Sequence, residues 1–185
     1  MLAREKFFKH GFYKVSLDSL VRDLKTSKSS LYNHFDSKED LVREILLRLN
    51  GEINGMLEEI VYDKKRSFFG KLTTITEFTG NLLNKTSDEF LHDLKIYTPE
   101  LWILYLNMRE ERINRYYKRL FESGIEEGIL RSDLNPALIL HAYFKLTEIA
   151  IQSDDFMGLE LTNQEAYNQI STLFLEGIMK KNKKY

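Results

Sequence analysis

The sequence lacks cysteine altogether and contains few of the residues that interrupt helices. Its 185 residues include no cysteine, two prolines and nine glycines. The absence of cysteine excludes a disulfide framework, a thiolate metal site and a cysteine nucleophile. Because proline and glycine are scarce and β-branched runs are few, the composition favours an all-α fold. The 43% hydrophobic residues can bury a substantial core.

Long apolar runs are also missing. No stretch approaches the roughly 20 apolar residues that cross a bilayer, and the N-terminus lacks the pattern of a signal peptide. We therefore expect a cytoplasmic protein with no membrane partner.

Catalytic and metal-binding patterns are absent as well. His10, His34, His92 and His141 lie far apart in the sequence, and none has a metal-ligand spacing such as His-x-x-x-His. The sequence has no glycine-rich phosphate loop and no Gly-x-Ser-x-Gly motif. We therefore expect no enzyme activity, no catalytic residue, no metal site and no cofactor.

Charge is distributed unevenly along the chain. Residues 1–38 contain eight lysines and arginines against four acidic residues, a net charge of +4, whereas the whole chain carries −1. The remaining residues 39–185 therefore carry −5. A basic end on an acidic body is the electrostatic pattern expected of a DNA-binding head.

Within the basic end, residues 16–35 have the pattern of a helix-turn-helix. Ser16 stands at an N-cap position, and the apolar residues of 17–24 recur at the spacing of one helix face. Ser27 caps a second short helix whose apolar side is only Leu31 and Phe35. Its other face is small, polar or basic, which suits a helix in the DNA major groove. The alternative is a helical hairpin with a solvated outer face, which the positive charge disfavours.

Residues 3–41 resemble the N-terminal domain of the TetR (tetracycline repressor-like) family of bacterial transcription regulators. The matching segments are Ala3, Phe7, Gly11 and Phe12, then Ser16-Leu17, Ser27 to Phe35, and Ser37 to Leu41. The resemblance implies an all-α protein of about nine helices. It implies a three-helix DNA-binding head over residues 1–45, with its motif at about 16–35. It also implies a helical effector-binding and dimerisation domain over residues 46–185.

The sequence departs from the family pattern in two places. Lys25 occupies a turn position that is usually glycine, and a non-glycine residue held left-handed there costs roughly 1–2 kcal/mol, so the turn is either strained or shaped differently. The chain also begins part-way through the first helix, without the usual basic leader. This leaves open either fewer minor-groove and phosphate contacts or a trimmed N-terminus.

Capping signals divide the rest of the chain into helices. Ser37 with Asp40 opens a long helix that Gly51 and Gly55 interrupt, which predicts close packing, a frayed segment or a softened joint between head and body. Further helix starts are predicted at the capping box Thr86–Glu89, at Pro99, at Pro136 and at the capping box Thr162–Glu165. The helix from Pro99 is expected to end near Gly124 or Gly128.

The predicted DNA contacts lie in and around the second helix of the motif. Hydroxyl and amide groups are expected to reach base edges from Ser29, Ser30 and Asn33. Phosphate contacts are expected from Ser16, Lys28, Tyr32, His34 and Lys38.

Aromatic residues of the central helices predict an effector pocket for an apolar or aromatic molecule. The candidates are Phe78, Tyr97, Trp102, Tyr105, Met108, Tyr117 and Phe144. The alternative is that these side chains simply fill a helical core.

Wide apolar faces on the last two long helices predict a homodimer built around a four-helix bundle. The expected interface residues are Ile139, Ala142, Tyr143, Leu146, Ala150, Ala166, Ile170, Phe174 and Gly177. Core packing within one subunit is the alternative for part of these faces.

Together these patterns favour a homodimeric transcriptional repressor that binds a double-stranded DNA operator and is released by a small apolar or aromatic effector. Two alternatives remain open. One is a DNA binder without an effector, and the other is a helical scaffold or interaction module that has lost DNA binding.

Overall fold

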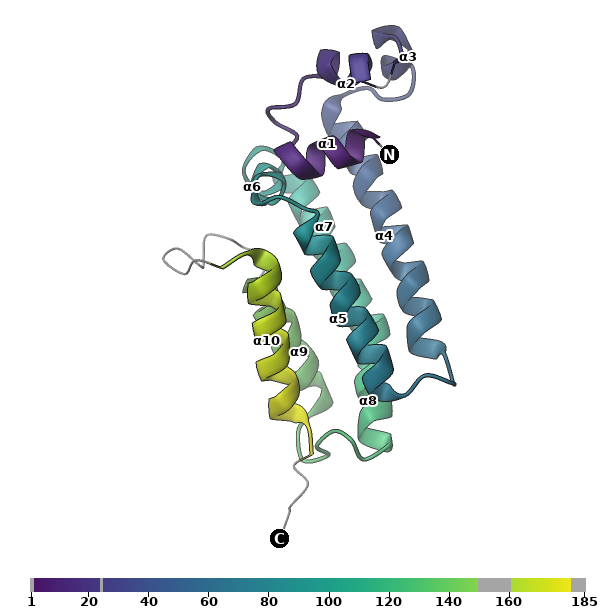
Figure 1. Cartoon of the computed structure of the whole chain (residues 1–185), viewed down its shortest axis with the longest axis vertical. Helices are drawn as coiled ribbons and strands as arrows, with labels where there is room; N and C mark the ends of the chain where they lie inside the picture. Colours follow the sequence, from purple (N-terminus) through teal and green to yellow (C-terminus); the bar gives the residue numbers. More distant parts are fainter. Residues whose placement is uncertain (1, 24, 150–160, 181–185) are drawn as a thin grey trace. The chain divides into compact units, whose positions relative to one another are not determined.

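A computed structural model describes residues 2–23, 25–149 and 161–180 and shows an all-α protein (Figure 1). The helices are α1 (Leu2–His10), α2 (Leu17–Asp23), α3 (Lys28–Tyr32), α4 (Lys38–Tyr62), α5 (Phe68–Asn84), α6 (Asp88–Tyr97), α7 (Pro99–Arg112), the π-helical turn η1 (Ile113–Tyr117), α8 (Lys118–Glu126), α9 (Pro136–Ile149) and α10 (Asn163–Ile178). Because α7, η1 and α8 follow without a break, the described residues form nine separate helical segments. None of the described helices is long and apolar enough to span a bilayer.

Residue contacts divide the chain into two compact units. The first contains Met1–Ile53 and Lys85–Met108, and the second contains Asn54–Asn84 and Arg109–Tyr185. Helices α4 and α7 therefore contribute residues to both units. The predicted boundary after residue 45 separates a DNA-binding head from an effector-binding body by function rather than by residue contacts. It stays a prediction.

Side-chain caps begin most of the helices where the sequence predicts. Ser16 Oγ accepts from Ser19 N at 3.1 Å, and Ser37 Oγ accepts from Asp40 N at 3.0 Å. Both halves of the Thr162 capping box form. The prediction for α6 was off by one residue, because Ser87 rather than Thr86 is the N-cap.

The first unit is built around phenylalanine rings that join α1 to α6. Phe12 is 1% exposed, and its ring centroid lies 6.1 Å from that of Phe90. After α1, Gly11 has a φ of +71°, and a Cβ there would lie 2.5 Å from Asp93 Oδ2. The position therefore needs glycine both for its backbone conformation and for the approach of α6.

The second unit packs α10 against α5 and α9, with α8 completing the core. Phe121, Tyr143 and Phe174 form a ring cluster with centroids 5.4–6.1 Å apart. Gly128, with a φ of +70°, follows the end of α8, as one of the two predicted stops requires.

The glycines of α4 do not serve helix packing. A Cβ at Gly51 or Gly55 would meet no atom of the described residues within 4 Å. The close-packing explanation is therefore wrong for these positions, and a locally weakened helix remains as a prediction.

Candidate nucleic-acid interface

The predicted recognition helix is α3, and it is shorter than expected. The helix covers Lys28–Tyr32, whereas the sequence pattern predicted helix as far as Phe35. Ser27 Oγ caps its start by accepting from Ser30 N at 3.0 Å, and Asn33 is the C-cap. With five residues, α3 has too few internal hydrogen bonds to be stable alone. Leu31, 8% exposed, anchors it to the unit.

The turn between α2 and α3 has the strained conformation, one of the two that the sequence left open. Lys25 has a φ of 51°, so a non-glycine residue is held in the left-handed region here. Its N–H donates to Arg22 O at 3.2 Å, and the N–H of Thr26 donates to Val21 O at 3.2 Å. The turn is therefore hydrogen-bonded despite the strained residue.

The outer face of α3 brings the predicted base-reading residues together. Ser29 and Asn33 are exposed, and Ser30, whose N–H donates to the capping Ser27, is half-buried. Next to them, Tyr32 is 45% exposed, and His34 Nδ1 lies 2.9 Å from Ser30 O. The segment thus presents hydroxyl, amide and imidazole groups within two helical turns.

Lys28, a predicted phosphate contact, is paired within the protein. Its Nζ lies 2.9 Å from Asp18 Oδ1, and both side chains are exposed. The hydrogen bond and the charge of Lys28 hold the pKa of Asp18 below its ordinary value, while the same pair raises the pKa of Lys28. DNA phosphate must therefore compete with Asp18 for this ammonium group.

Lys38, the other lysine expected at phosphate, also has internal acceptors. Its Nζ donates to Tyr13 O at 3.0 Å and to Val15 O at 3.4 Å. The amine therefore bridges the start of α4 to the segment after α1. A phosphate contact from Lys38 requires a third acceptor at the same ammonium group or the loss of one of these bonds.

Sequence reasoning did not single out the basic groups that the structure leaves unpaired. Lys14, Arg22 and Lys25 are exposed and form no ion pair among the described residues, although the charge of Arg22 acts on Asp18 of the same helix. In the sequence these residues stand out only through their contribution to the positive charge of the head. In contrast, Arg4 pairs with Glu52 at 2.7 Å, and Lys6 pairs with Asp23.

Tyr13 joins the head to α6 as well as to α4. Its N–H donates to Asp93 Oδ2 at 2.8 Å, and its ring stacks on Tyr97 with centroids 3.8 Å apart. Ser87 N also donates to Phe8 O at 2.7 Å, at the start of α6. We call Tyr13 with Lys38, Asp93 and Tyr97 the Tyr13 junction.

Comparison with known proteins agrees with this geometry. A sequence model described as "Bacterial regulatory proteins, tetR family" matches residues 2–45, which contain α1 to α3 and the start of α4. Residues 2–45 therefore form a TetR-family DNA-binding domain. The chain is a DNA-binding transcription regulator, and this confirms the expectation that it is not an enzyme.

The similarity extends over nearly the whole chain. The HTH-type transcriptional repressor KstR2 of Mycobacterium tuberculosis H37Rv is 24% identical over 196 residues, covering 97% of this chain and 90% of that protein. The repressor DhaR of Mycobacterium sp. GP1 is 25% identical over 180 residues, covering 94% and 86%. The crystal structure of regulatory protein TetR from Rhodobacter sphaeroides shares the fold. Its TM-score is 0.74 at 15% identity, with 96% of each chain covered.

In this TetR-family regulator, the predicted effector residues fall in two different units. Tyr97, Trp102, Tyr105 and Met108 belong to the first unit, and Phe78, Tyr117 and Phe144 belong to the second. Trp102 and Tyr105 stack with centroids 5.4 Å apart, whereas Tyr97 is occupied by the Tyr13 junction. The pocket as a whole remains a prediction.

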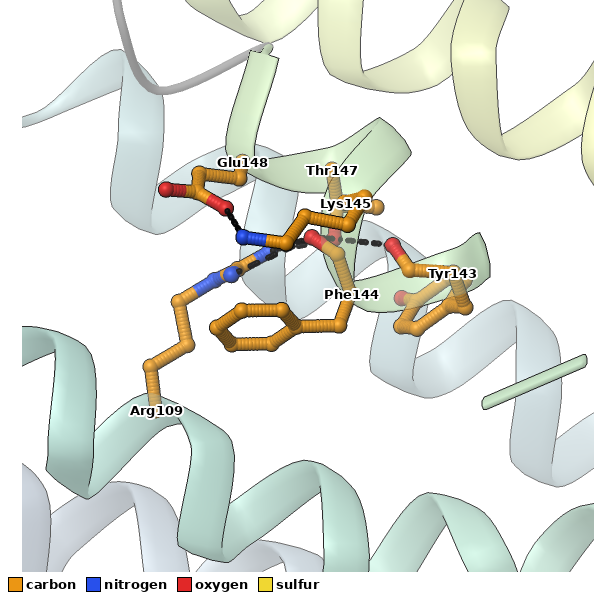
Figure 2. Close-up of polar contacts among 6 residues, drawn as sticks. All are labelled: Arg109, Tyr143, Phe144, Lys145, Thr147 and Glu148. Atoms are coloured by element: carbon orange, nitrogen blue, oxygen red, sulfur yellow. Dashed lines mark hydrogen bonds and ion pairs between the residues drawn. The ribbon is translucent and has the colours of Figure 1, made fainter. Parts of the chain in front are cut away.

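The second-unit candidates have different environments. Tyr117 is 7% exposed and packs on Tyr143 with centroids 4.9 Å apart, and its burial raises its pKa well above the ordinary value. Phe144 is half-buried, and Figure 2 shows its ring beside the Arg109 guanidinium, whose carbon lies 4.7 Å from the ring centroid. Phe78 is half-buried on α5.

Arg109 was not singled out in the sequence, although it is 7% exposed. Its Nη1 and Nη2 donate to Phe144 O at 3.4 and 3.3 Å, and Nη2 also donates to Thr147 Oγ1 (Figure 2). These bonds tie the end of α7 to α9. The sequence signal was weak, because Arg109 stands in a run of charged residues that is typical of a solvated face.

The predicted dimer residues separate into two groups. Ile139, Tyr143 and Ala166 are at most 6% exposed within their own subunit, so they are core residues rather than surface residues. Ala142, Ile170 and Phe174 are half-buried, and Leu146 and Gly177 are exposed. Ala150 lies outside the described residues. The most exposed apolar side chains on these helices are instead Leu138 at 64% and Leu173 at 71%.

Proposed function

We propose that the protein is a homodimeric repressor that binds a near-palindromic operator and is released from it by a small-molecule effector. Two relatives that match over most of the chain, KstR2 and DhaR, carry the name of transcriptional repressor. Their similarity supports repression as the sign of regulation in this chain.

The observation that carries the proposal is the exposed polar face of α3. Ser29, Ser30 and Asn33 stand on a helix whose start is fixed by Ser27 and whose inner side is held by Leu31. Small hydroxyl and amide groups on such a helix can donate to and accept from base edges in the major groove. In this proposal Ser16, Lys28, Tyr32, His34 and Lys38 contact phosphates, and Arg22 and Lys14 add further phosphate contacts.

The exposed apolar stripes of α9 and α10 support the dimer. On α9 the stripe contains Leu138, Ala142, Leu146 and Ile149, spaced four, four and three residues apart. On α10 it contains Ile170, Leu173 and Gly177. A two-fold mate would bury both stripes in a four-helix bundle. This face replaces the predicted residues that the subunit already uses in its core.

The Tyr13 junction supports a route from effector to DNA. Because Tyr13 is held by Asp93 and Tyr97 on α6 and by Lys38 on α4, a shift of α6 relative to α4 changes how the head is held. To reduce operator affinity 100-fold, the effector must favour the released state by about 2.8 kcal/mol. Reciprocity requires the operator to weaken effector binding equally.

The test of DNA binding is a fluorescence anisotropy titration with DNA from upstream of the protein's own gene and with a scrambled duplex. The proposal expects tighter binding to the upstream DNA. An interaction module that has lost DNA binding would bind both duplexes equally or neither.

The test of the dimer is light scattering of the wild type and of two matched variants. The wild type should have twice the 21.9 kDa subunit mass. Leu173→Glu on α10 should produce monomer, whereas Leu47→Glu, at a 46% exposed position on α4, should not. A monomeric wild type at micromolar concentration contradicts the dimer.

A further inference from the structure

A groove of about 490 Å³ lies in the second unit between η1 and the first part of α9. Its volume is that of a site for a single small molecule, which typically needs 300–1,000 Å³ or so. Of the residues that line it, only Phe144 belongs to the predicted effector pocket.

The π-helical turn shapes one wall of this groove. Lys118 N–H donates to Ile113 O, five residues earlier, in place of the α-helical bond. In an α-helix, residues five apart point about 140° away from each other. The wider π turn brings them onto one side, so Ile113 and Lys118 both line the groove. Such turns are rare and are frequently found at functional sites.

The floor of the groove is apolar, and Arg109 fixes the position of one of its residues. Ile113 and Leu140 are 5% and 8% exposed, and the Phe144 ring forms the third part. Arg109 lies against this ring and donates to the backbone oxygen of the same residue (Figure 2). A ligand therefore meets a surface that is already ordered, which lowers the entropic cost of binding.

Lys118 is an unpaired cation at the rim. It is exposed and has no hydrogen-bond or ion-pair partner among the described residues. The neighbouring basic residues of the same helix are paired, Arg115 with Glu58 at 3.3 Å and Arg119 with Glu126 at 3.7 Å. Lys118 is thus the ammonium group of this wall that can neutralise a bound anion.

The two ends of the groove carry opposite charges. Arg109 contacts Phe144 and Thr147, whereas Tyr117 contacts Tyr143, so this helix and α9 run antiparallel. Glu110 therefore lies toward the Phe144 end of the groove, and Lys118 lies toward the Pro136 end. A negatively charged group is repelled at the first end and attracted at the second.

We propose that this groove binds an amphipathic small molecule with a single anionic group. Its apolar body lies on Ile113, Leu140 and Phe144, and its anion pairs with Lys118. This inference rests on the proposed function in one respect: if the protein is a repressor released by an effector, the molecule bound in this groove is that effector.

The experiment compares two fluorescent probes on the full-length protein. Anilinonaphthalene sulfonate has an apolar body and an anion, and phenylnaphthylamine has the same rings without the sulfonate. Lys118→Gln should weaken sulfonate binding by about 5-fold, as expected for loss of an exposed charge pair, and leave the neutral probe unchanged. Lys65→Gln, the same charge change at an exposed residue outside the groove, should alter neither. Ala137→Phe, which fills the groove from an exposed position, should abolish binding of both probes.

Each outcome decides a different part of the inference. Sulfonate binding that survives both Lys118→Gln and Ala137→Phe overturns the site. Equal loss of both probes in Lys118→Gln overturns the anionic class. An Ala137→Phe protein that becomes monomeric shows a second subunit in the groove and also overturns the proposal. Thermal melts identify any variant that is not folded. If Ala137→Phe is not folded, the comparison of Lys118→Gln with Lys65→Gln decides whether the anion binds at Lys118.

The proposed function is checked separately on probe-free protein. Loss of any preference for upstream DNA there contradicts the repressor while leaving the groove results standing.

Discussion

The DNA-binding end and the groove of the second unit use basic residues in opposite ways. Around α3, Lys28 and Lys38 already have acceptors within the protein, Asp18 for one and two backbone oxygens for the other. In the groove, Lys118 has no partner among the described residues. DNA presents many phosphates and can displace internal partners one by one, because each contact also releases a counterion. A small molecule offers a single charge, so it binds more favourably to an ammonium group that has no internal partner to displace.

The two regions also differ in how their residues are collected. The α3 face comes from one continuous segment, residues 27–35, whereas the groove combines residues from Glu110 to Phe144 that only packing brings together. Substitutions on the α3 face should therefore have effects that follow from local backbone and charge, whereas substitutions where distant segments meet should act through packing.

Gly11→Ala should cause the largest change. The left-handed backbone and the 2.5 Å approach of Asp93 Oδ2 together should lower the free energy of unfolding by about 2–4 kcal/mol. Gly51→Ala in α4 of the same unit is the matched control, and it should raise the free energy of unfolding by about 1 kcal/mol. Urea denaturation of both variants measures the difference. Equal effects of the two substitutions would contradict the contact between α6 and the head.

Asn33→Ala should reduce discrimination between operator and scrambled DNA by about 1–3 kcal/mol per half-site, because the variant cannot hydrogen-bond to a base edge. Arg22→Gln should instead weaken both DNAs alike. It should also flatten the plot of log K against log salt by about 0.9 for each phosphate that the variant no longer neutralises. Anisotropy titrations at several salt concentrations separate the two effects. A salt slope changed by Asn33→Ala but not by Arg22→Gln would reverse these assignments.

Lys25→Gly should stabilise the first unit by about 1 kcal/mol, since glycine adopts a φ of 51° without strain. Lys25→Ala removes the same charge while keeping the strained backbone, so it serves as the control. The two melting curves should differ even though both variants lose equal DNA affinity. If alanine and glycine melt together, the strain at this turn is negligible.

Asp18→Asn should have the smallest effect, a modest gain in affinity for every DNA sequence. The substitution frees Lys28 and removes a negative charge near the phosphates. Because the pKa of Asp18 is lowered in the folded state, its stabilising pair is complete above the unfolded pKa and is lost only as pH falls through the folded value. The pKa of Lys28 is raised, so its part is lost only above its ordinary alkaline range. The gain from Asp18→Asn should therefore be the same at pH 6 and pH 8, and a gain that depends on pH in this window contradicts the pairing.

Much of the architecture could be predicted because the signals are local. Caps such as Ser27 and Thr162 depend on residues within one helical turn, so the sequence pattern predicted them, and it narrowed the stop of α8 to two glycines, of which Gly128 is the one used. At Lys25 the sequence marked an unusual turn position but left a strained turn and a different shape open, and the φ of 51° decides for the strained turn. The end of α3 was not predictable, because a helix of five residues depends on what it packs against.

Hydrophobic spacing, composition and short-range capping are enough to predict the all-α fold, the basic head and the polar face of the recognition helix. Which apolar residues face solvent depends instead on the packing of distant segments, which buries Ile139 and Tyr143 in the core and leaves Leu138 and Leu173 outside. The tertiary structure also decided which cations are free, because the partners of Lys6, Lys28 and Lys38 come from other segments. Helical periodicity marks an apolar side chain in the same way whether its own subunit or a partner buries it. Packing between distant segments determines which of the two buries the side chain, and a local sequence pattern does not contain that information.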